Sequence, residues 1–127
     1  MTYKLLIVDD SKLARMAIVK ALKSCYPEGV LVEAGSAKDA LSAMERDTPD
    51  IALVDFNMPT QDGLRLVADL RKLSPQMPIA IISANHQQEV INRTTALGAR
   101  FLPKPVAEKE LNAFLESATR DLEGAVS

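Results

Sequence analysis

The feature that most constrains the fold is a set of short apolar runs, rich in isoleucine and valine, that recur along the 127-residue chain. Their hydrophobic residues are mostly consecutive rather than alternating, which is typical of strands that are covered on both faces in a parallel sheet. We expect four such strands and a weaker fifth, at residues 5–8, 30–32, 51–54, 79–82 and 100–102.

Segments of helical periodicity follow these runs. We expect helices at 12–24, 37–46, 63–73, 87–97 and 106–122. Ser36, with Asp39 three residues later, fits an N-terminal cap, and Gly98 fits the position after a helix where a positive φ is needed. In the first helix the cationic residues are expected on the side opposite the apolar stripe, at Lys12, Arg15, Lys20 and Lys23.

A strand followed by a helix, five times over, indicates right-handed βαβ units around a parallel sheet. Five strands are too few for an eight-stranded barrel. The prediction is therefore an α/β fold, a flavodoxin-like, doubly wound open parallel sheet of five βα units with strand order 2-1-3-4-5. We expect a single domain over 1–127, with its core at about 4–122 and a frayed tail at 123–127.

Composition and charge exclude several classes of protein. The formal charge of −2 shows no basic excess, so no nucleic-acid partner is expected. No apolar run approaches the ~20 residues that span a bilayer, and the first run is too short for a secretion signal. The single cysteine, Cys25, cannot form an internal disulfide. We therefore expect a cytoplasmic protein without a membrane partner.

Chemically capable residues follow four of the expected strands: Asp9 and Asp10, Asp55, Ser83, and Lys104 with Pro105. Taken singly, such residues are usually solvated strand ends or turns. In a sheet of order 2-1-3-4-5, however, the carboxyl ends of neighbouring strands meet at one crevice. Three carboxylates that converge there need positive charge, from Lys104 or from a divalent cation such as Mg²⁺. The combination is suited to holding a phosphoryl group, with a carboxylate as nucleophile.

Four motifs carry a family resemblance: LLIVDDS at 5–11, LVDFNMPTQDG at 53–63, IISA at 81–84 and FLPKP at 101–105. Together they resemble the receiver domain of two-component response regulators, from about Lys4 to Leu122. The resemblance implies that Asp55 accepts a phosphoryl group from a phosphohistidine, carried by a histidine kinase or a histidine phosphotransfer protein. No histidine base is needed, and His86, in the loop after the fourth strand, is expected to be solvated.

The resemblance also assigns the remaining roles. It implies a Mg²⁺ or Mn²⁺ ion held directly by Asp10, Asp55 and the backbone carbonyl of Asn57, and by Asp9 through water. It implies that Lys104 pairs with the phosphoryl group, that Ser83 moves to bond a phosphoryl oxygen, and that Pro105 follows a cis peptide bond. Phe101 stands at the aromatic switch position in place of the commoner tyrosine. Gly63 is expected to supply the turn into the third helix.

The implied function is that of a signalling domain rather than an enzyme with its own substrate: it catalyses its own phosphorylation and dephosphorylation. Phosphorylation is expected to change the face formed by the fourth helix, fifth strand and fifth helix, which binds an unidentified protein target. Little chain follows Leu122, so the expected output is protein contact, or a role as a phosphate relay or sink, unless the chain is a domain of a longer protein.

Two other functions would use similar residues on a similar fold. A phosphatase of the haloacid dehalogenase type also has an aspartate nucleophile, but it needs a second aspartate two residues later, where this chain has Asn57. A flavin or nucleotide carrier needs a phosphate-binding first loop rich in glycine, serine or threonine. Here that loop is DDSK, which is acidic and lacks glycine.

Overall fold

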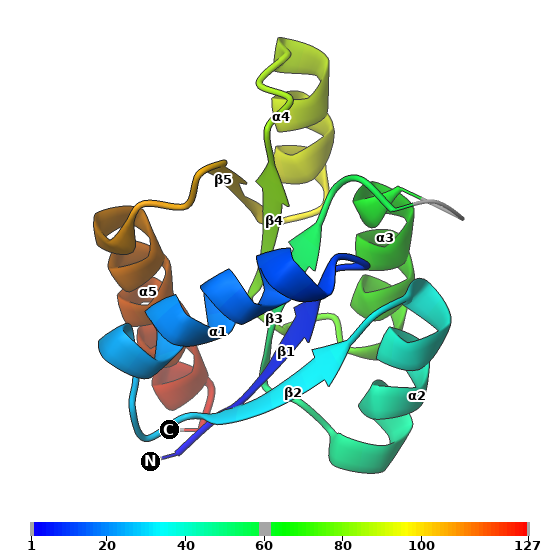
Figure 1. The fold of residues 1–127 in the computed structure, drawn as a ribbon. Coiled ribbons are helices and arrows are strands. Elements are labelled where there is room, and N and C mark those ends of the chain that lie inside the picture. Colours follow the sequence, from blue (N-terminus) through cyan, green and yellow to red (C-terminus); the bar gives the residue numbers. More distant parts are fainter. Residues whose placement is uncertain (1, 59–61, 127) are drawn as a thin grey trace.

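The computed structural model describes residues 2–58 and 62–126, with the backbone alone described at 125 and 126 (Figure 1). Its strands are β1 (Lys4–Val8), β2 (Val30–Ala34), β3 (Ile51–Asp55), β4 (Ile79–Ser83) and β5 (Arg100–Pro103). Its helices are α1 (Lys12–Cys25), α2 (Ala37–Asp47), α3 (Gly63–Leu73), α4 (Gln88–Ala96) and α5 (Glu108–Val126).

The five strands form one parallel sheet of order β2-β1-β3-β4-β5, which confirms the predicted flavodoxin-like α/β topology. All five residues of β3 and of β4 are buried, as their continuous apolar runs predicted. The edge strand β2 is more exposed, with Val30 at 47%. The two most buried strands end in Asp55 and Ser83, so the sheet holds both residues at its carboxyl edge.

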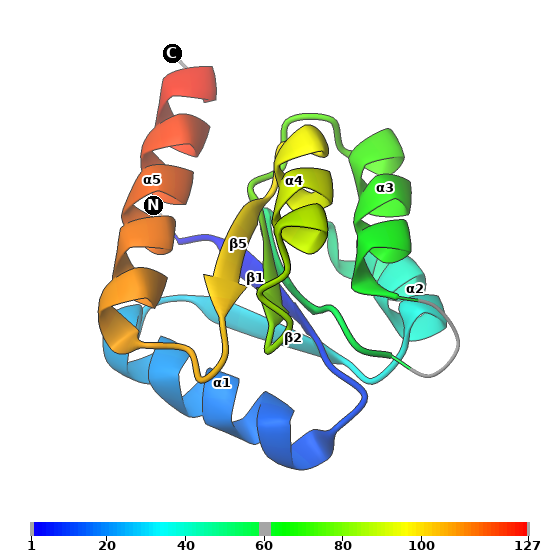
Figure 2. The ribbon, with the colours of Figure 1, turned by 90° about the horizontal axis from the view of Figure 1, so that it is seen from above.

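Two hydrophobic cores cover the two faces of the sheet, because successive side chains along a strand point to opposite sides. Leu5 and Ile7 of β1 pack with residues of α1 and α5. Leu6 and Val8 pack on the other face with residues of α2, α3 and α4. Figure 2 shows the same arrangement, with α1 and α5 on one side of the sheet and the other three helices opposite.

Side-chain caps begin three of the helices. The hydroxyl of Ser11 accepts a hydrogen bond from the Ala14 amide at 3.2 Å, and that of Ser36 accepts one from the Asp39 amide at 3.0 Å. The Asp62 carboxylate caps α3 in the same way. Such caps satisfy amides that have no partner within the helix. Gly98 follows α4 with a φ of +68°, as predicted.

The C-terminal segment ends in a long helix. Helix α5 continues to Val126, and it packs through Leu111, Leu115 and Leu122 on the core beneath the sheet. Fraying at 123–127 stays a prediction. Ser127 lies outside the described residues. Within the described range, no helix is long and apolar enough to cross a membrane.

Arg71, near the end of α3, ties together segments at the amino end of the sheet. Its guanidinium donates hydrogen bonds to four main-chain carbonyls: Met77 at 2.6 Å, Leu97 at 3.0 Å, and Pro75 and Gly98 at 3.1 Å each. Burial lowers the pKa of this guanidinium below its ordinary value, although an arginine side chain stays charged in proteins. The contacts join α3 to the chain entering β4 and to the turn entering β5.

Candidate functional site

Three carboxylates converge at the carboxyl edge of the sheet. Asp55 is the last residue of β3, and Asp9 follows β1 in the neighbouring position, because Val8 pairs with Val54 in the parallel register. Each of Asp9, Asp10 and Asp55 offers a carboxylate oxygen, and these oxygens all lie within 4.8 Å of one another. Asp9 and Asp55 are only 5% and 4% exposed, whereas Asp10 is open to solvent. The predicted convergence is present.

Lys104 reaches this cluster from the other side. Its Nζ lies 2.6 Å from Oδ1 of Asp55, and its main-chain amide donates to the Ser83 carbonyl at 2.9 Å. The Lys104–Pro105 peptide bond is cis, as the resemblance implied. Among the described residues, no donor with good hydrogen-bond geometry reaches Asp55 Oδ1, so the contact with Lys104 is a close ion pair rather than an aligned hydrogen bond.

The three carboxylates of the acidic cluster face a single ammonium, that of Lys104, among the described residues. Burial raises the pKa of Asp55 above its ordinary value, the charges of Asp9 and Asp10 raise the pKa further, and contact with Lys104 lowers it without reversing the shift. A second cation would relieve this repulsion. Convergent carboxylates, one of them with a poorly bonded buried oxygen, suit hard cations such as Mg²⁺ or Mn²⁺. The residues therefore fit the predicted metal site.

Asp9 and Asn57 are placed differently within this site. The Asp9 carboxylate already accepts a hydrogen bond from the Ser11 amide at 2.9 Å, which orients its Oδ1. Asn57 is exposed in the loop after β3. Coordination by the Asn57 carbonyl, and by Asp9 through water, stays a prediction. The part of the LVDFNMPTQDG motif at 59–61 lies outside the described residues.

Gly63 supports β3 by a close approach rather than by a turn. It is the first residue of α3, where Asp62 caps the helix, and its φ is not in the left-handed region. A Cβ at position 63 would overlap the Asp55 carbonyl oxygen and lie 2.9 Å from Phe56 Cα. The expected turn role is therefore replaced: glycine is required because helix and strand backbones touch directly beside Asp55.

Ser83 is 1% exposed at the end of β4, one residue beyond the pairing of Asp55 with Ile82. Its hydroxyl accepts a hydrogen bond from the Asn85 amide at 2.9 Å and is 3.3 Å from the Asn85 carbonyl oxygen, to which it donates. The hydroxyl is thus engaged with the β4–α4 loop. A role for Ser83 at a phosphoryl group requires these local bonds to be exchanged.

Phe101 and His86 form a contact that the sequence did not predict. Phe101 is partly buried on β5, and its ring meets the ring of His86 edge to face, with centroids 5.8 Å apart. His86 is exposed, as expected, but it is also a partner of Phe101. No periodic signal links a loop residue to a strand residue, so the sequence does not indicate that the two rings are paired.

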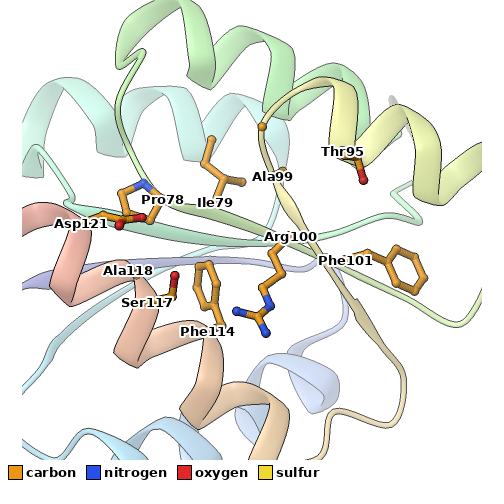
Figure 3. Close-up of a pocket in the computed structure, with 11 residues that line it drawn as sticks. Pro78, Ile79, Thr95, Ala99, Arg100, Phe101, Phe114, Ser117, Ala118 and Asp121 are labelled. Carbon is orange, nitrogen blue, oxygen red and sulfur yellow. The ribbon is translucent and has the colours of Figure 1, made fainter.

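A hollow of about 360 Å³ lies between α4, β5 and α5, on the face that was predicted to change. Figure 3 shows Phe101 at one end of it, with Pro78 and Asp121 at the other and Arg100 and Phe114 between them. The acidic cluster is not part of its lining. The carboxyl-edge site and this hollow are therefore separate features: Phe101 of β5 lines the hollow, and Lys104, which directly follows β5, reaches the site.

Arg15 is a second residue whose placement was missed. The sequence placed it on the outer side of α1, but its side chain is only 17% exposed. Nη1 donates to the Asp9 carbonyl at 2.7 Å and Nε donates to Oε1 of Glu33 at 3.0 Å. The one available signal was Glu33, a carboxylate at the end of the strand beside β1, which can receive a guanidinium from the helix that follows β1.

Curated relatives match this chain along most of its length. The Glycerol metabolism activator of Pseudomonas putida is 32% identical over 116 residues, which are 90% of this chain and 52% of that protein. Response regulator MprA of Mycolicibacterium vanbaalenii is 32% identical over 124 residues, 94% of this chain and 52% of that protein. The chain thus spans about half the length of these curated relatives.

Structural comparison and the family profile agree. The solved structure of Vibrio cholerae chemotaxis protein CheY4 matches with a TM-score of 0.82 at 26% identity, covering 93% of this chain and 99% of that one. The profile described as the response regulator receiver domain matches residues 5–116, which is most of the chain. On this evidence the chain belongs to the response regulator receiver domain family of two-component systems.

Proposed function

We propose that Asp55 of this receiver domain accepts a phosphoryl group from a phosphohistidine, on a histidine kinase or a histidine phosphotransfer protein. The observation that carries the proposal is the setting of Asp55. It is a buried carboxylate at the end of a buried strand, 2.6 Å from the Lys104 ammonium and within a group of three carboxylates. A structural ion pair would not need two further carboxylates beside it.

In the proposed reaction a carboxylate oxygen of Asp55 forms a bond to phosphorus as the P–N bond of the donor breaks. The electron pair of that bond returns to the donor imidazole, which takes a proton from water. The product is an aspartyl phosphate. Water later attacks its phosphorus, which restores the Asp55 carboxylate and releases phosphate. Such transfers depend on positioning and on neutralising the charge of the phosphoryl oxygens.

Two sources of positive charge serve these oxygens. Lys104 exchanges its contact with Asp55 Oδ1 for a phosphoryl oxygen, which its flexible side chain permits. Asp10, Asp55 and the Asn57 carbonyl, with Asp9 acting through water, would hold a Mg²⁺ or Mn²⁺ ion, which would supply the second charge. Asn57 offers no carboxylic acid at the position where the phosphatase alternative needs one.

The proposed switch follows from the bonds that Ser83 makes. When its hydroxyl leaves Asn85 for a phosphoryl oxygen, the β4–α4 loop loses an anchor and moves toward the site. Phe101 then turns inward from His86, which changes the face formed by α4, β5 and α5 for an unidentified protein target. If beryllofluoride, a phosphoryl mimic, left the NMR shifts of residues 86–110 unchanged, this switch would be wrong.

The surroundings of the site suit a protein donor. A hollow of about 520 Å³ lies beside Asp9 and Lys104, with a mostly apolar lining from α1 and from the chain after β5. Leu13 and Met16 of α1 are exposed at 78% and 55%. Large exposed hydrophobic side chains favour docking of another protein. Cys25 is a free thiol, and we place the protein in the reducing cytoplasm.

The test uses a small phosphodonor, acetyl phosphate, with Mg²⁺ and phosphate-affinity electrophoresis. We expect wild-type protein to be labelled and Asp55→Asn to remain unlabelled. Asp39→Asn, which changes an exposed carboxylate on α2, is the matched control and should be labelled normally. Labelling of Asp55→Asn at the wild-type rate would overturn the assignment, and steady turnover of phosphomonoesters would favour the phosphatase.

A further inference from the structure

Arg15 lies close to the acidic cluster, and in the described part of the chain it is bonded to none of the three carboxylates. Its guanidinium extends from the second turn of α1 back to the strand ends, in the direction that helical side chains favour. There it contacts the Asp9 main-chain carbonyl and the Glu33 carboxylate. It also lies over Gly35, since a Cβ at 35 would come within 3.4 Å of Nη1.

The Asp9 carbonyl belongs to the peptide unit that connects Asp9 to Asp10. Because a peptide unit is planar, a bond that fixes its oxygen also fixes the direction in which the chain enters Asp10. Other bonds hold Asp9 itself, through its amide to Ala34 and its carboxylate to Ser11. Asp10 is exposed and lacks such packing. Its approach to Asp55 therefore depends on the peptide that Arg15 holds.

We infer that Arg15 is a positioning residue for the divalent-cation site. By tying the Asp9–Asp10 peptide to Glu33 at the end of β2, it keeps the Asp10 carboxylate turned toward Asp55. This inference rests on the proposed function, since it concerns the same metal site. Glu33 in turn fixes Arg15, because a guanidinium held at Nε and at Nη1 cannot rotate away from the carbonyl.

Charge and position predict opposite effects when Arg15 becomes uncharged. As a positive charge alone, Arg15 repels Mg²⁺, so its removal would tighten metal binding. As a positioning residue, its removal lets Asp10 turn away and weakens binding. The sign of the change in affinity thus separates the two roles without reference to phosphorylation.

The experiment measures Mg²⁺ binding to the folded protein by calorimetry. We expect Arg15→Gln to raise the Kd about tenfold, the lower end of the range for groups that orient metal ligands. Lys12→Gln, which removes an exposed charge from the start of the same helix, should leave the Kd unchanged or lower it. Arg15→Lys keeps one donor for the Asp9 carbonyl and should recover part of the loss.

Two further readouts exclude a general loss of structure. In the metal-free protein, Arg15→Gln should shift the carbonyl carbon resonance of Asp9, and Lys12→Gln should not. In phosphorylation by acetyl phosphate, Arg15→Gln should raise the KM for Mg²⁺ and retain the rate at saturating Mg²⁺.

Failure of the inference and failure of the proposed function give different results. If wild type binds Mg²⁺, Asp10→Asn loses it, and Arg15→Gln binds as tightly as wild type or more tightly, only the role of Arg15 is overturned. If wild type does not bind Mg²⁺, or Asp10→Asn binds it equally well, the metal site itself is wrong and the inference falls with it.

Discussion

Lys104 and Arg71 hold their positive charges at opposite ends of the same sheet. At the carboxyl edge, the Lys104 ammonium faces Asp55 Oδ1 at 2.6 Å, and that oxygen has no aligned hydrogen bond among the described residues. At the amino edge, the Arg71 guanidinium donates to four carbonyls. An ammonium is a rotatable point charge, whereas a guanidinium is a rigid planar fork.

The contrast shows how one sheet separates stability from reactivity. At the Arg71 end the guanidinium already donates to four carbonyls, so a change of partner there would bring little gain in hydrogen bonding. At the Lys104 end, three carboxylates repel one another and the ammonium makes no aligned hydrogen bond to Asp55. A metal ion would reduce this repulsion, and the ammonium is free to bind a phosphoryl oxygen instead. If this interpretation is right, substitutions at the two ends should affect different measurements, phosphorylation at one end and unfolding at the other.

The largest expected effect is that of Lys104→Met on phosphorylation. Loss of the ammonium should slow labelling by acetyl phosphate about 100-fold or more, the usual consequence of removing one group that stabilises transition-state charge. The free energy of unfolding should change by about 1 kcal/mol or less, because Lys104 is partly solvated. Lys109→Met, an exposed lysine of α5, is the control. A labelling rate near that of wild type would remove the distinction between the two ends.

Arg71→Gln tests the amino end. Losing bonds from a charged donor to several carbonyls should lower the free energy of unfolding by about 2–4 kcal/mol. Urea denaturation followed by circular dichroism measures this change. Arg71→Lys should recover only part, because one ammonium cannot reach all four carbonyls. The labelling rate of the folded variant should match that of wild type, and a large fall in that rate would show that the ends are coupled.

Gly63→Ala tests how firmly the backbone holds Asp55 in position. The added methyl overlaps the Asp55 carbonyl oxygen, so we expect a loss of about 1–3 kcal/mol in unfolding free energy, typical of overpacking. Labelling should also slow, because relief of the overlap moves Asp55. Gly124→Ala is the matched control, since a Cβ there meets nothing within 4 Å. Unchanged stability and labelling in Gly63→Ala would mean that the reactive end tolerates displacement.

The smallest expected effect is a gain in stability from Asp55→Asn in the absence of divalent cations. The raised pKa of Asp55 means that the folded state holds its proton more tightly than the unfolded state, so ionisation disfavours folding. The stability that this group contributes is complete below its ordinary pKa of 3.8 and is lost as the pH rises through the folded-state pKa.

Asparagine does not titrate, so the advantage of Asp55→Asn should grow with pH above that ordinary value. At neutral pH we expect on the order of 1 kcal/mol, the low end for removal of a buried charge. Urea denaturation in EDTA across a pH series measures it. If the gain in stability of Asp55→Asn were greatest in acid, the pKa of Asp55 would be lowered rather than raised in the folded state. The contact with Lys104 would then outweigh the effect of burial.

The fold could be predicted because each strand has a continuous apolar run and each helix a periodic one. The convergence of Asp55 with Asp9 and Lys104 could be predicted for the same reason: in a parallel sheet, whatever follows neighbouring strands meets at one edge. Neither inference needs to know where a particular side chain points.

The contacts that escaped prediction depend on that direction. Periodicity places Arg15 on a face of α1 but does not say that its long side chain folds back to the strand ends. Gly63 looked like a turn residue because sequence does not reveal how closely two backbones approach. The hydrogen bonds of the Ser83 hydroxyl depend on its rotamer and on the conformation of the β4–α4 loop. The contacts of Arg71 could not be predicted because its partners are main-chain carbonyls, which every residue type possesses.

That last property has a consequence for how the sequence can drift. The Arg71 clamp recognises main-chain oxygens, so exchanging Pro75 or Leu97 for another residue leaves the recognised atom in place. Of the positions involved, 71 requires a particular side chain, and 98 requires a residue that accepts positive φ. A library that randomises the loops around this clamp should therefore yield many folded members, as long as codon 71 is held fixed.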